Sequence, residues 1–108
     1  MKYFVNWQTV MLDADGTVWK DHKGKLGISG GVDKIFDSEE EAFAYVRGRR
    51  DYDQKVIDGK IMTPQLWFGK EIVSFDECDY FIEYVTKQHL HFGVTQITQL
   101  SVYWDEDL

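Results

Sequence analysis

The sequence of 108 residues predicts a single α+β domain over residues 1–108, in which a mostly antiparallel sheet of about five to seven strands carries two helices packed on one face. Three observations lead to this class. Runs rich in aromatic and β-branched residues open and close the chain, as strands do. Two segments with helical spacing each follow a serine that can cap a helix. Two-residue turns that contain glycine separate the remaining apolar runs, as in antiparallel hairpins.

The first element is a strand over residues 3–12, because this run is aromatic and β-branched with apolar residues on both faces. The sequence Asp-Ala-Asp-Gly at 13–16 predicts a turn, and residues 17–19 a returning strand. Residues 21–31 contain four glycines and several charges, which predicts a loop with a short strand near 26–28.

The first helix is predicted over about residues 39–48. The Ser38 hydroxyl can accept the backbone N–H of Glu41, and the Glu41 carboxylate can reach back to the N–H of Ser38. Gly48 offers a stop at the C-terminus. The positions that recur at helical spacing and would face the core are Ala42, Phe43 and Val46.

Two hairpins are predicted after this helix. Asp58-Gly59 is a pair preferred in type I′ turns, which predicts a hairpin over residues 55–62. Gly69-Lys70 suits a type II′ turn and predicts a second hairpin over residues 66–73.

A second helix is predicted over about residues 75–90, after a second capping box at 74–77. Its apolar arc would comprise Cys78, Phe81, Ile82, Val85 and His89. Residues 94–104 then predict a long final strand that is paired on both sides.

Residues 36–46 and 75–85 are similar, with four identical positions when they are aligned. Duplication of a strand–strand–helix unit would explain the similarity. Chance likeness between two capped, amphipathic helices would explain it as well.

The charge is distributed unevenly. The formal net charge is −7, from 12 basic and 19 acidic residues, and all of the excess lies in residues 71–108. Binding to a phosphate backbone requires clustered lysines and arginines, so no direct nucleic-acid binding is expected. A local acidic field instead steers a partner of opposite charge.

No apolar run approaches the ~20 residues of a bilayer span, and the N-terminal residues lack the apolar segment of a signal peptide. The single cysteine, Cys78, excludes an internal disulfide and suits a reducing compartment. We therefore expect a cytoplasmic protein without a membrane segment.

Residues 9–17, Thr-Val-Met-Leu-Asp-Ala-Asp-Gly-Thr, resemble the first motif of the haloacid dehalogenase phosphatase superfamily. The resemblance implies that Asp13 is the nucleophile toward phosphate and that Asp15 is a general acid/base beside Mg²⁺. It also implies a doubly wound parallel sheet, whereas the hairpin turns of this chain indicate antiparallel pairing. The sequence therefore favours a plain turn at both aspartates and no catalytic residues.

His89, His91 and Cys78 are residue types that bind transition metals. On the predicted helix, Cys78 and His89 fall on the core side, and positions two apart do not share a face. The spacing predicts packed or half-exposed side chains, no metal site and no cofactor.

The candidate binding residues are five side chains of the predicted second helix. Asp76, Asp79 and Glu83 would form an acidic stripe, with Tyr80 and Tyr84 beside it. Acids steer a basic partner and tyrosines supply contact area at low entropic cost. The other interpretation is a solvated helix face whose tyrosines cover neighbouring strands.

These observations predict a small, non-enzymatic, stoichiometric binding protein of the immunity, toxin-inhibitor or mobile-element inhibitor class. Its partner would be a protein with a basic surface, such as a nucleic-acid-binding protein. One alternative is an accessory or structural domain that self-associates, and the oligomeric state stays open. The other alternative is a phosphotransfer enzyme that uses Asp13 and Asp15.

Overall fold

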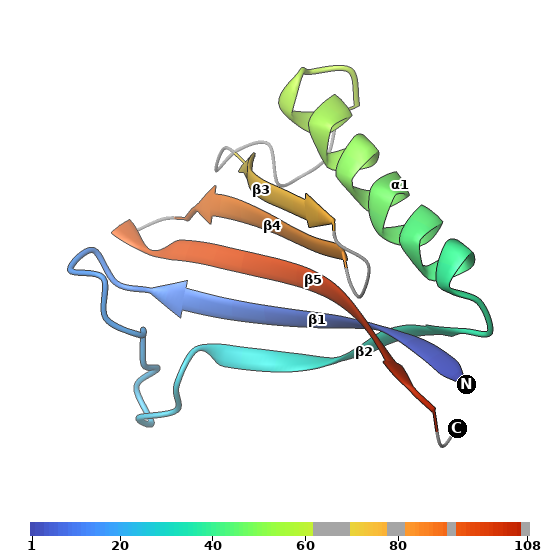
Figure 1. Ribbon diagram of the computed structural model, residues 1–108. Helices are drawn as coiled ribbons and strands as arrows, with labels where there is room; N and C mark the ends of the chain where they lie inside the picture. Colours follow the sequence, from blue (N-terminus) through green and yellow to red (C-terminus); the bar gives the residue numbers. More distant parts are fainter. Residues whose placement is uncertain (62–69, 78–81, 91–92, 107–108) are drawn as a thin grey trace.

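A computed structural model describes residues 1–61, 70–77, 82–90 and 93–106. Its elements follow in the order β1 (Lys2–Leu12), β2 (Ile28–Phe36), α1 (Glu39–Ile57), β3 (Lys70–Glu77), β4 (Ile82–His89) and β5 (Thr95–Asp105). The strands form one five-stranded sheet in the order β2-β1-β5-β4-β3, and every neighbouring pair is antiparallel (Figure 1). The predicted α+β class with an antiparallel sheet is confirmed. Within the described residues there is one helix rather than two.

The centre of the sheet is the pair formed by β1 and β5. All eleven residues of each strand are paired, from Lys2 opposite Asp105 to Leu12 opposite Thr95. The predicted first and last strands are thereby confirmed. β5 pairs with β4 on its other side, as its length predicted, so its backbone groups find partners in two neighbours.

The turn predicted after β1 is confirmed. The N–H of Gly16 donates to the Asp13 carbonyl at 2.9 Å, and Gly16 has a φ of 86°, which L side chains rarely adopt. The returning segment is shorter than predicted, because Val18 forms only an isolated bridge with Leu12.

β2 is a correction to the predicted loop at 21–31. The strand begins at Ile28 and runs to Phe36 at the edge of the sheet, with eight of its nine residues exposed. The sequence of β2 contains glycines and charged residues and lacks the usual strand pattern. An exposed edge strand does not need alternating apolar residues. Its pairing with β1 shifts between Val5 and Asn6, where Asp33 is the extra residue.

The cap of α1 is confirmed, since Ser38 Oγ accepts the backbone N–H of Glu41 at 3.2 Å. The helix then continues through Gly48 and ends at Ile57, nine residues later than predicted. A glycine inside a helix costs about 1 kcal/mol relative to alanine, which packing of the helix against the sheet offsets.

The hairpin predicted over residues 55–62 is wrong, because residues 55–57 form the last turn of α1. Asp58 is the C-cap, and Gly59 adopts a φ of 75°, as glycine does after a helix. Both a type I′ turn and a helix C-terminus use glycine at positive φ, so the dipeptide suited either structure. The hairpin predicted over 66–73 lies largely outside the described residues.

The second helix predicted over residues 75–90 is wrong. β3 and β4 occupy most of this range, with Phe75 opposite Tyr84 and Asp76 opposite Glu83, while residues 78–81 lie outside the described part. The similar segments 36–46 and 75–85 therefore fold differently, and no duplicated structural unit is present among the described residues.

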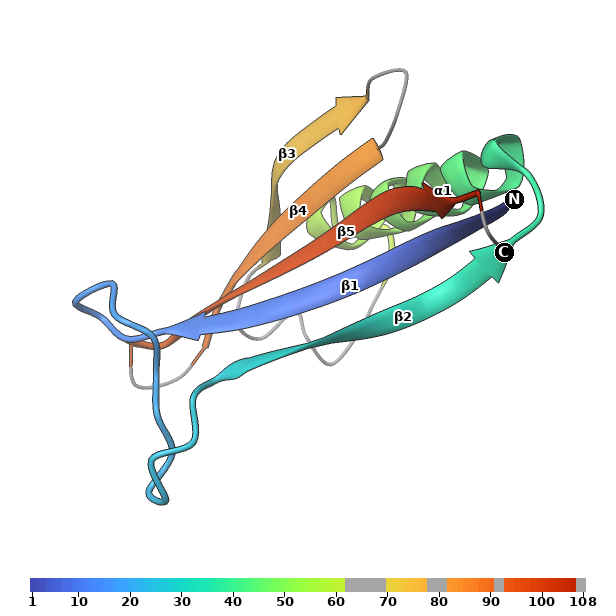
Figure 2. The same ribbon diagram turned by 60° about the horizontal axis from the view of Figure 1, so that its bottom comes forward.

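α1 lies across one face of the sheet, at the end where β1 begins (Figures 1 and 2). The core between them comprises Val5, Ala42, Phe43, Val46, Tyr84, Leu100 and Val102. The opposite face, here called the open face, is not covered by any described element (Figure 2). Searched over the described residues, the structure contains no helix with the length and apolarity needed to cross a membrane.

Candidate functional site

Two of the predicted binding residues meet on the open face. Asp76 of β3 is exposed and lies directly opposite Glu83 of β4. Like charges in this position repel each other, and a cation between them would relieve the repulsion. Gln99 of β5 already supports Glu83, because its Nε2 donates to Glu83 Oε1 at 2.6 Å.

Tyr84 does not join this pair. It points to the α1 side of the sheet and is 2% exposed. Asp79 and Tyr80 lie outside the described residues. The structure thus brings together Asp76 and Glu83 and separates Tyr84 from them, and the binding role of all five residues stays a prediction.

The open face also presents apolar side chains that the sequence did not single out. Ile28, Val32 and Ile35 of β2 and Tyr103 of β5 are all exposed on this face, and both Ile35 and Tyr103 lie opposite Phe4 of β1. Val32 and Ile35 are 50% and 55% exposed. The Tyr103 ring stacks on Phe4 with centroids 5.0 Å apart.

A hollow of about 420 Å³ lies among these residues, lined in part by Asn6, Gly30, Val32, Ser101 and Tyr103. At Gly30 a Cβ atom would lie 3.0 Å from the backbone oxygen of Trp7, so the close approach of β2 to β1 favours glycine there. Among the described residues, Asn6 Oδ1 is buried without a hydrogen-bond partner.

Asp13 and Asp15 lie in the turn after β1. Asp15 Oδ1 accepts the backbone N–H of Thr17 at 3.0 Å and its hydroxyl at 2.7 Å. These bonds from Thr17 lower the pKa of the Asp15 carboxyl, so Asp15 is ionised and engaged in the turn. The surrounding antiparallel sheet is not the doubly wound fold that the phosphatase resemblance implied.

We expect no phosphatase activity from these two aspartates. The Asp13→Asn variant should hydrolyse a generic phosphomonoester in the presence of Mg²⁺ no differently from the wild type, because neither should exceed the buffer rate. The measurement is product release over time. Turnover by the wild type that disappears in Asp13→Asn would contradict this expectation.

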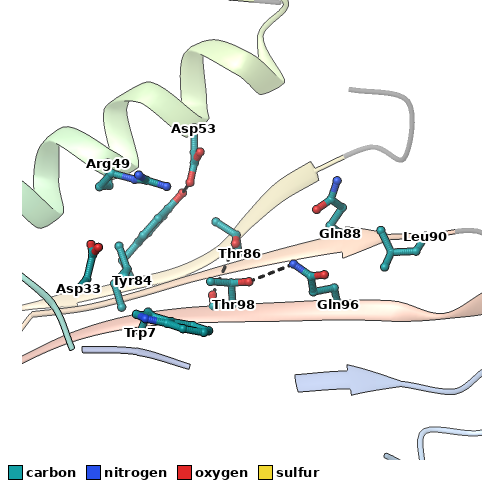
Figure 3. A pocket seen from close by; sticks show the side chains of 11 residues that line it. Trp7, Asp33, Arg49, Asp53, Tyr84, Thr86, Gln88, Leu90, Gln96 and Thr98 are labelled. Atoms are coloured by element: carbon teal, nitrogen blue, oxygen red, sulfur yellow. Dashed lines mark hydrogen bonds between the residues drawn. The ribbon is translucent and has the colours of Figure 1, made fainter. Parts of the chain in front are cut away.

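A second candidate region, here called the α1 pocket, lies between the helix and the sheet. Its volume is about 550 Å³. The strands continue past α1, and their helix-facing side chains form the floor of the pocket (Figures 1 and 3). These floor residues are Thr86, Gln88, Gln96 and Thr98, with Trp7, Leu90 and Leu100 beside them.

A buried pair of polar residues closes one end of the α1 pocket. The hydroxyl of Tyr84 donates to Asp53 Oδ2 on α1, and both residues are 2% exposed. Burial raises the pKa of the Tyr84 phenol, and the bond to Asp53 raises it further. Arg49, one helical turn before Asp53, acts in the opposite direction. Tyr84 therefore remains a neutral hydrogen-bond donor.

A similar pair stands at the β2 rim of the pocket. The Tyr45 hydroxyl donates to Asp33 Oδ2 at 2.5 Å, and Lys34 Nζ lies 5.9 Å from the Tyr45 ring centroid. Burial, followed by the bond to Asp33, raises the pKa of Tyr45. The bulge of β2 turns Asp33 toward α1 and so allows its hydrogen bond with Tyr45.

Metal binding receives no support from the described part of the chain, where no group of three or more histidine, cysteine, aspartate or glutamate side chains gathers. His89 lies 4.0 Å from a Glu71 oxygen on the open face. Cys78 and His91 lie outside the described residues, so the predicted absence of a metal site stays a prediction.

The sequence indicates a buried position for Asp53 only if the helix continues past residue 48, where the predicted helix ends. Asp53 follows Val46 by seven residues, which places both on one face of a continuous helix. An acid on the apolar face of a helix indicates a buried partner. The partner, Tyr84, is 31 positions away, so its proximity was visible only in the fold.

No family model, no curated protein and no solved structure matches this chain. Over the residues that the structure describes, the fold and the two candidate regions define a small acidic α+β protein with an open sheet face and a pocket beside its helix.

Proposed function

We propose that this chain is a stoichiometric binding protein that acts on the basic surface of another protein through its open face. The observation that carries the proposal is the placement of the Asp76–Glu83 pair on the face that also exposes Val32, Ile35 and Tyr103. Immunity proteins, toxin inhibitors and mobile-element inhibitors are the class to which we assign it. A nucleic-acid-binding protein is the kind of partner proposed.

Apolar area and charge act together in this arrangement. Exposed apolar side chains gathered on one sheet face are typical of a protein-interaction surface. Acidic side chains at the margin raise the association rate with a basic partner.

The single cysteine and the net charge of −7 agree with a cytoplasmic location, which belongs to this proposal. Because Asp76 is exposed and Glu83 is partly exposed, salt should screen the attraction of this pair for the partner beyond about 8 Å at physiological ionic strength. Association should therefore slow as salt rises, while dissociation changes less.

The test is capture of partner proteins from a cell lysate on the immobilised chain, quantified by mass spectrometry. The variant Asp76→Lys/Glu83→Lys should lose most of the captured partner, because it reverses the charge of the pair. The control Glu40→Lys/Asp51→Lys makes the same change in net charge on exposed positions of α1, on the other side of the sheet. It should retain the partner.

Circular dichroism verifies that both variants are folded. Equal capture by the wild type and by Asp76→Lys/Glu83→Lys would overturn the proposal, as would equal loss in the control, because net charge alone would then explain binding. Capture of a second copy of this chain would favour the self-association alternative.

A further inference from the structure

The α1 pocket arises from a change in residue type along the strands. On the side of β5 that faces α1, Val102 and Leu100 belong to the core, and Thr98 and Gln96 follow on the same side. Strand period places all four on one face. The apolar face that α1 covers thus becomes a polar face where the strands pass beyond the helix.

β4 makes the same change at the same level. Tyr84 belongs to the core, and Thr86 and Gln88 line the pocket at 5% and 8% exposure. Burying hydroxyl and amide groups costs free energy, and an ordinary core would place valine and leucine here. Small-ligand sites place a few such polar side chains among apolar and aromatic ones, and Trp7, Leu90 and Leu100 supply the apolar part here.

The floor side chains are held in place by one another. Thr86 Oγ1 donates to the Thr98 carbonyl at 3.5 Å, and Gln96 Nε2 donates to Thr98 Oγ1 at 3.4 Å. Thr9 Oγ1 lies 3.2 Å from Thr98 Oγ1. Hydroxyl and amide groups of this kind both donate and accept, so they match ligand hydroxyls, which do the same.

The charges at the pocket do not suit an anion. Its lining contains two carboxylates, Asp33 and Asp53, and one guanidinium, Arg49 (Figure 3). The phenol of Tyr84 is committed to Asp53. A phosphate or carboxylate ligand would meet an excess of negative charge in a partly desolvated site.

Trp7 supplies an apolar surface on the pocket floor beside Thr98 (Figure 3). Its indole Nε1 lies 3.4 Å from where a Cβ atom of Gly31 would be, so the ring rests against a position that carries no side chain. The C–H face of a sugar ring packs on such an aromatic surface while its hydroxyls point elsewhere.

We propose that the α1 pocket binds a neutral, polyhydroxylated small molecule of saccharide size, with its ring against Trp7 and its hydroxyls on Thr98, Gln96 and Thr86. The volume of about 550 Å³ is within the range of small-molecule sites, about 300–1,000 Å³. This binding is separate from the protein interaction proposed for the open face, because the two regions lie on opposite sides of the sheet.

The test screens a panel of neutral mono- and disaccharides and inositol against the wild-type protein by saturation-transfer NMR, followed by titration of each binder. The phosphorylated and carboxylated counterparts of each sugar are included. At least one neutral sugar should bind. The affinity of its anionic counterpart should be lower by a factor of about ten or more.

The double variant Gln96→Leu/Thr98→Val removes two floor hydrogen-bonding groups and should weaken binding about tenfold or more. The control Thr95→Val/Gln99→Leu makes the same substitutions on the same strand but on the open face, and should bind the sugar within about twofold of the wild type. Unfolding midpoints verify that both variants are folded.

The proposal is overturned if the wild type binds no member of the panel, if anionic sugars bind as tightly as neutral ones, or if the two double variants behave alike. Failure here leaves the protein-binding proposal intact, because partner capture depends on Asp76 and Glu83. Conversely, loss of sugar binding in Asp76→Lys/Glu83→Lys would place the sugar on the open face and contradict the pocket assignment.

Discussion

Replacing Phe43 with alanine should lower the free energy of unfolding by about 3–5 kcal/mol. Phe43 is buried on the first half of α1, within the cluster that joins the helix to β1, β4 and β5. Its removal leaves a cavity in the core cluster that also contains Val5 and Val102, which are both almost fully buried. Urea unfolding followed by circular dichroism measures the change.

Tyr52→Ala is the matched control, because Tyr52 is another aromatic residue of α1 and is 43% exposed. Its loss should change stability by about 0.5 kcal/mol or less. An equal effect of the two substitutions would show that α1 meets the sheet with a different side from the one described.

The Tyr84→Phe variant should lose about 1–3 kcal/mol at neutral pH, because the buried carboxylate of Asp53 then lacks its phenolic donor. The ring itself remains, so the packing of the core is preserved. Tyr103→Phe removes a hydroxyl from an exposed ring of the open face and should leave stability nearly unchanged. Urea unfolding at pH 7 separates the two.

The wild type and Tyr84→Phe should also differ in how their stability depends on pH in the alkaline range. The pKa of Tyr84 is raised in the folded state, so the stability it contributes is complete below the unfolded-state pKa of about 10 and declines as pH rises above that value. Wild-type stability should fall more steeply than that of Tyr84→Phe between pH 9 and about 11. Parallel decline of the two proteins would mean that Tyr84 titrates normally.

The sequence predicted the elements whose signals are local. The Ser38 cap, the turn at 13–16 and the aromatic, β-branched strands β1 and β5 depend on neighbouring residues alone, and all three are found. The end of α1 was missed because packing against the sheet overrides the preference of Gly48 to stop a helix.

The sequence of β4 does not show a strand pattern, because hydroxyl and amide side chains stand at its buried positions. Tyr84, Thr86 and Gln88 alternate toward α1 with strand period, but threonine and glutamine do not count as apolar in a search for alternation. The apolar Val85 lies on the open face, whereas the helical pattern predicts it in the core. The buried polar side chains of β4 thus make the α1 pocket a candidate site, and they are also the reason that the sequence does not predict this strand.

The candidate binding residues show the same limit. The sequence places Asp76 and Glu83 on one stripe of a predicted helix, whereas in the structure they lie together because β3 and β4 pair at that register. Their association with Val32, Ile35 and Tyr103 depends on strand order in the sheet, which joins segments far apart in the sequence. Such contacts are fixed by tertiary structure, and no local spacing reports them.

The pairing of β1 with β5 determines when the chain can fold during synthesis. The second residue pairs with the 105th, so the middle of the sheet has a high contact order and closes slowly. A ribosome that adds about 5–20 residues per second leaves β1 without its central partner for roughly 5–20 s. During that time β2 can protect only one edge of β1. The central pair of the sheet is therefore completed only after residue 105 has left the exit tunnel.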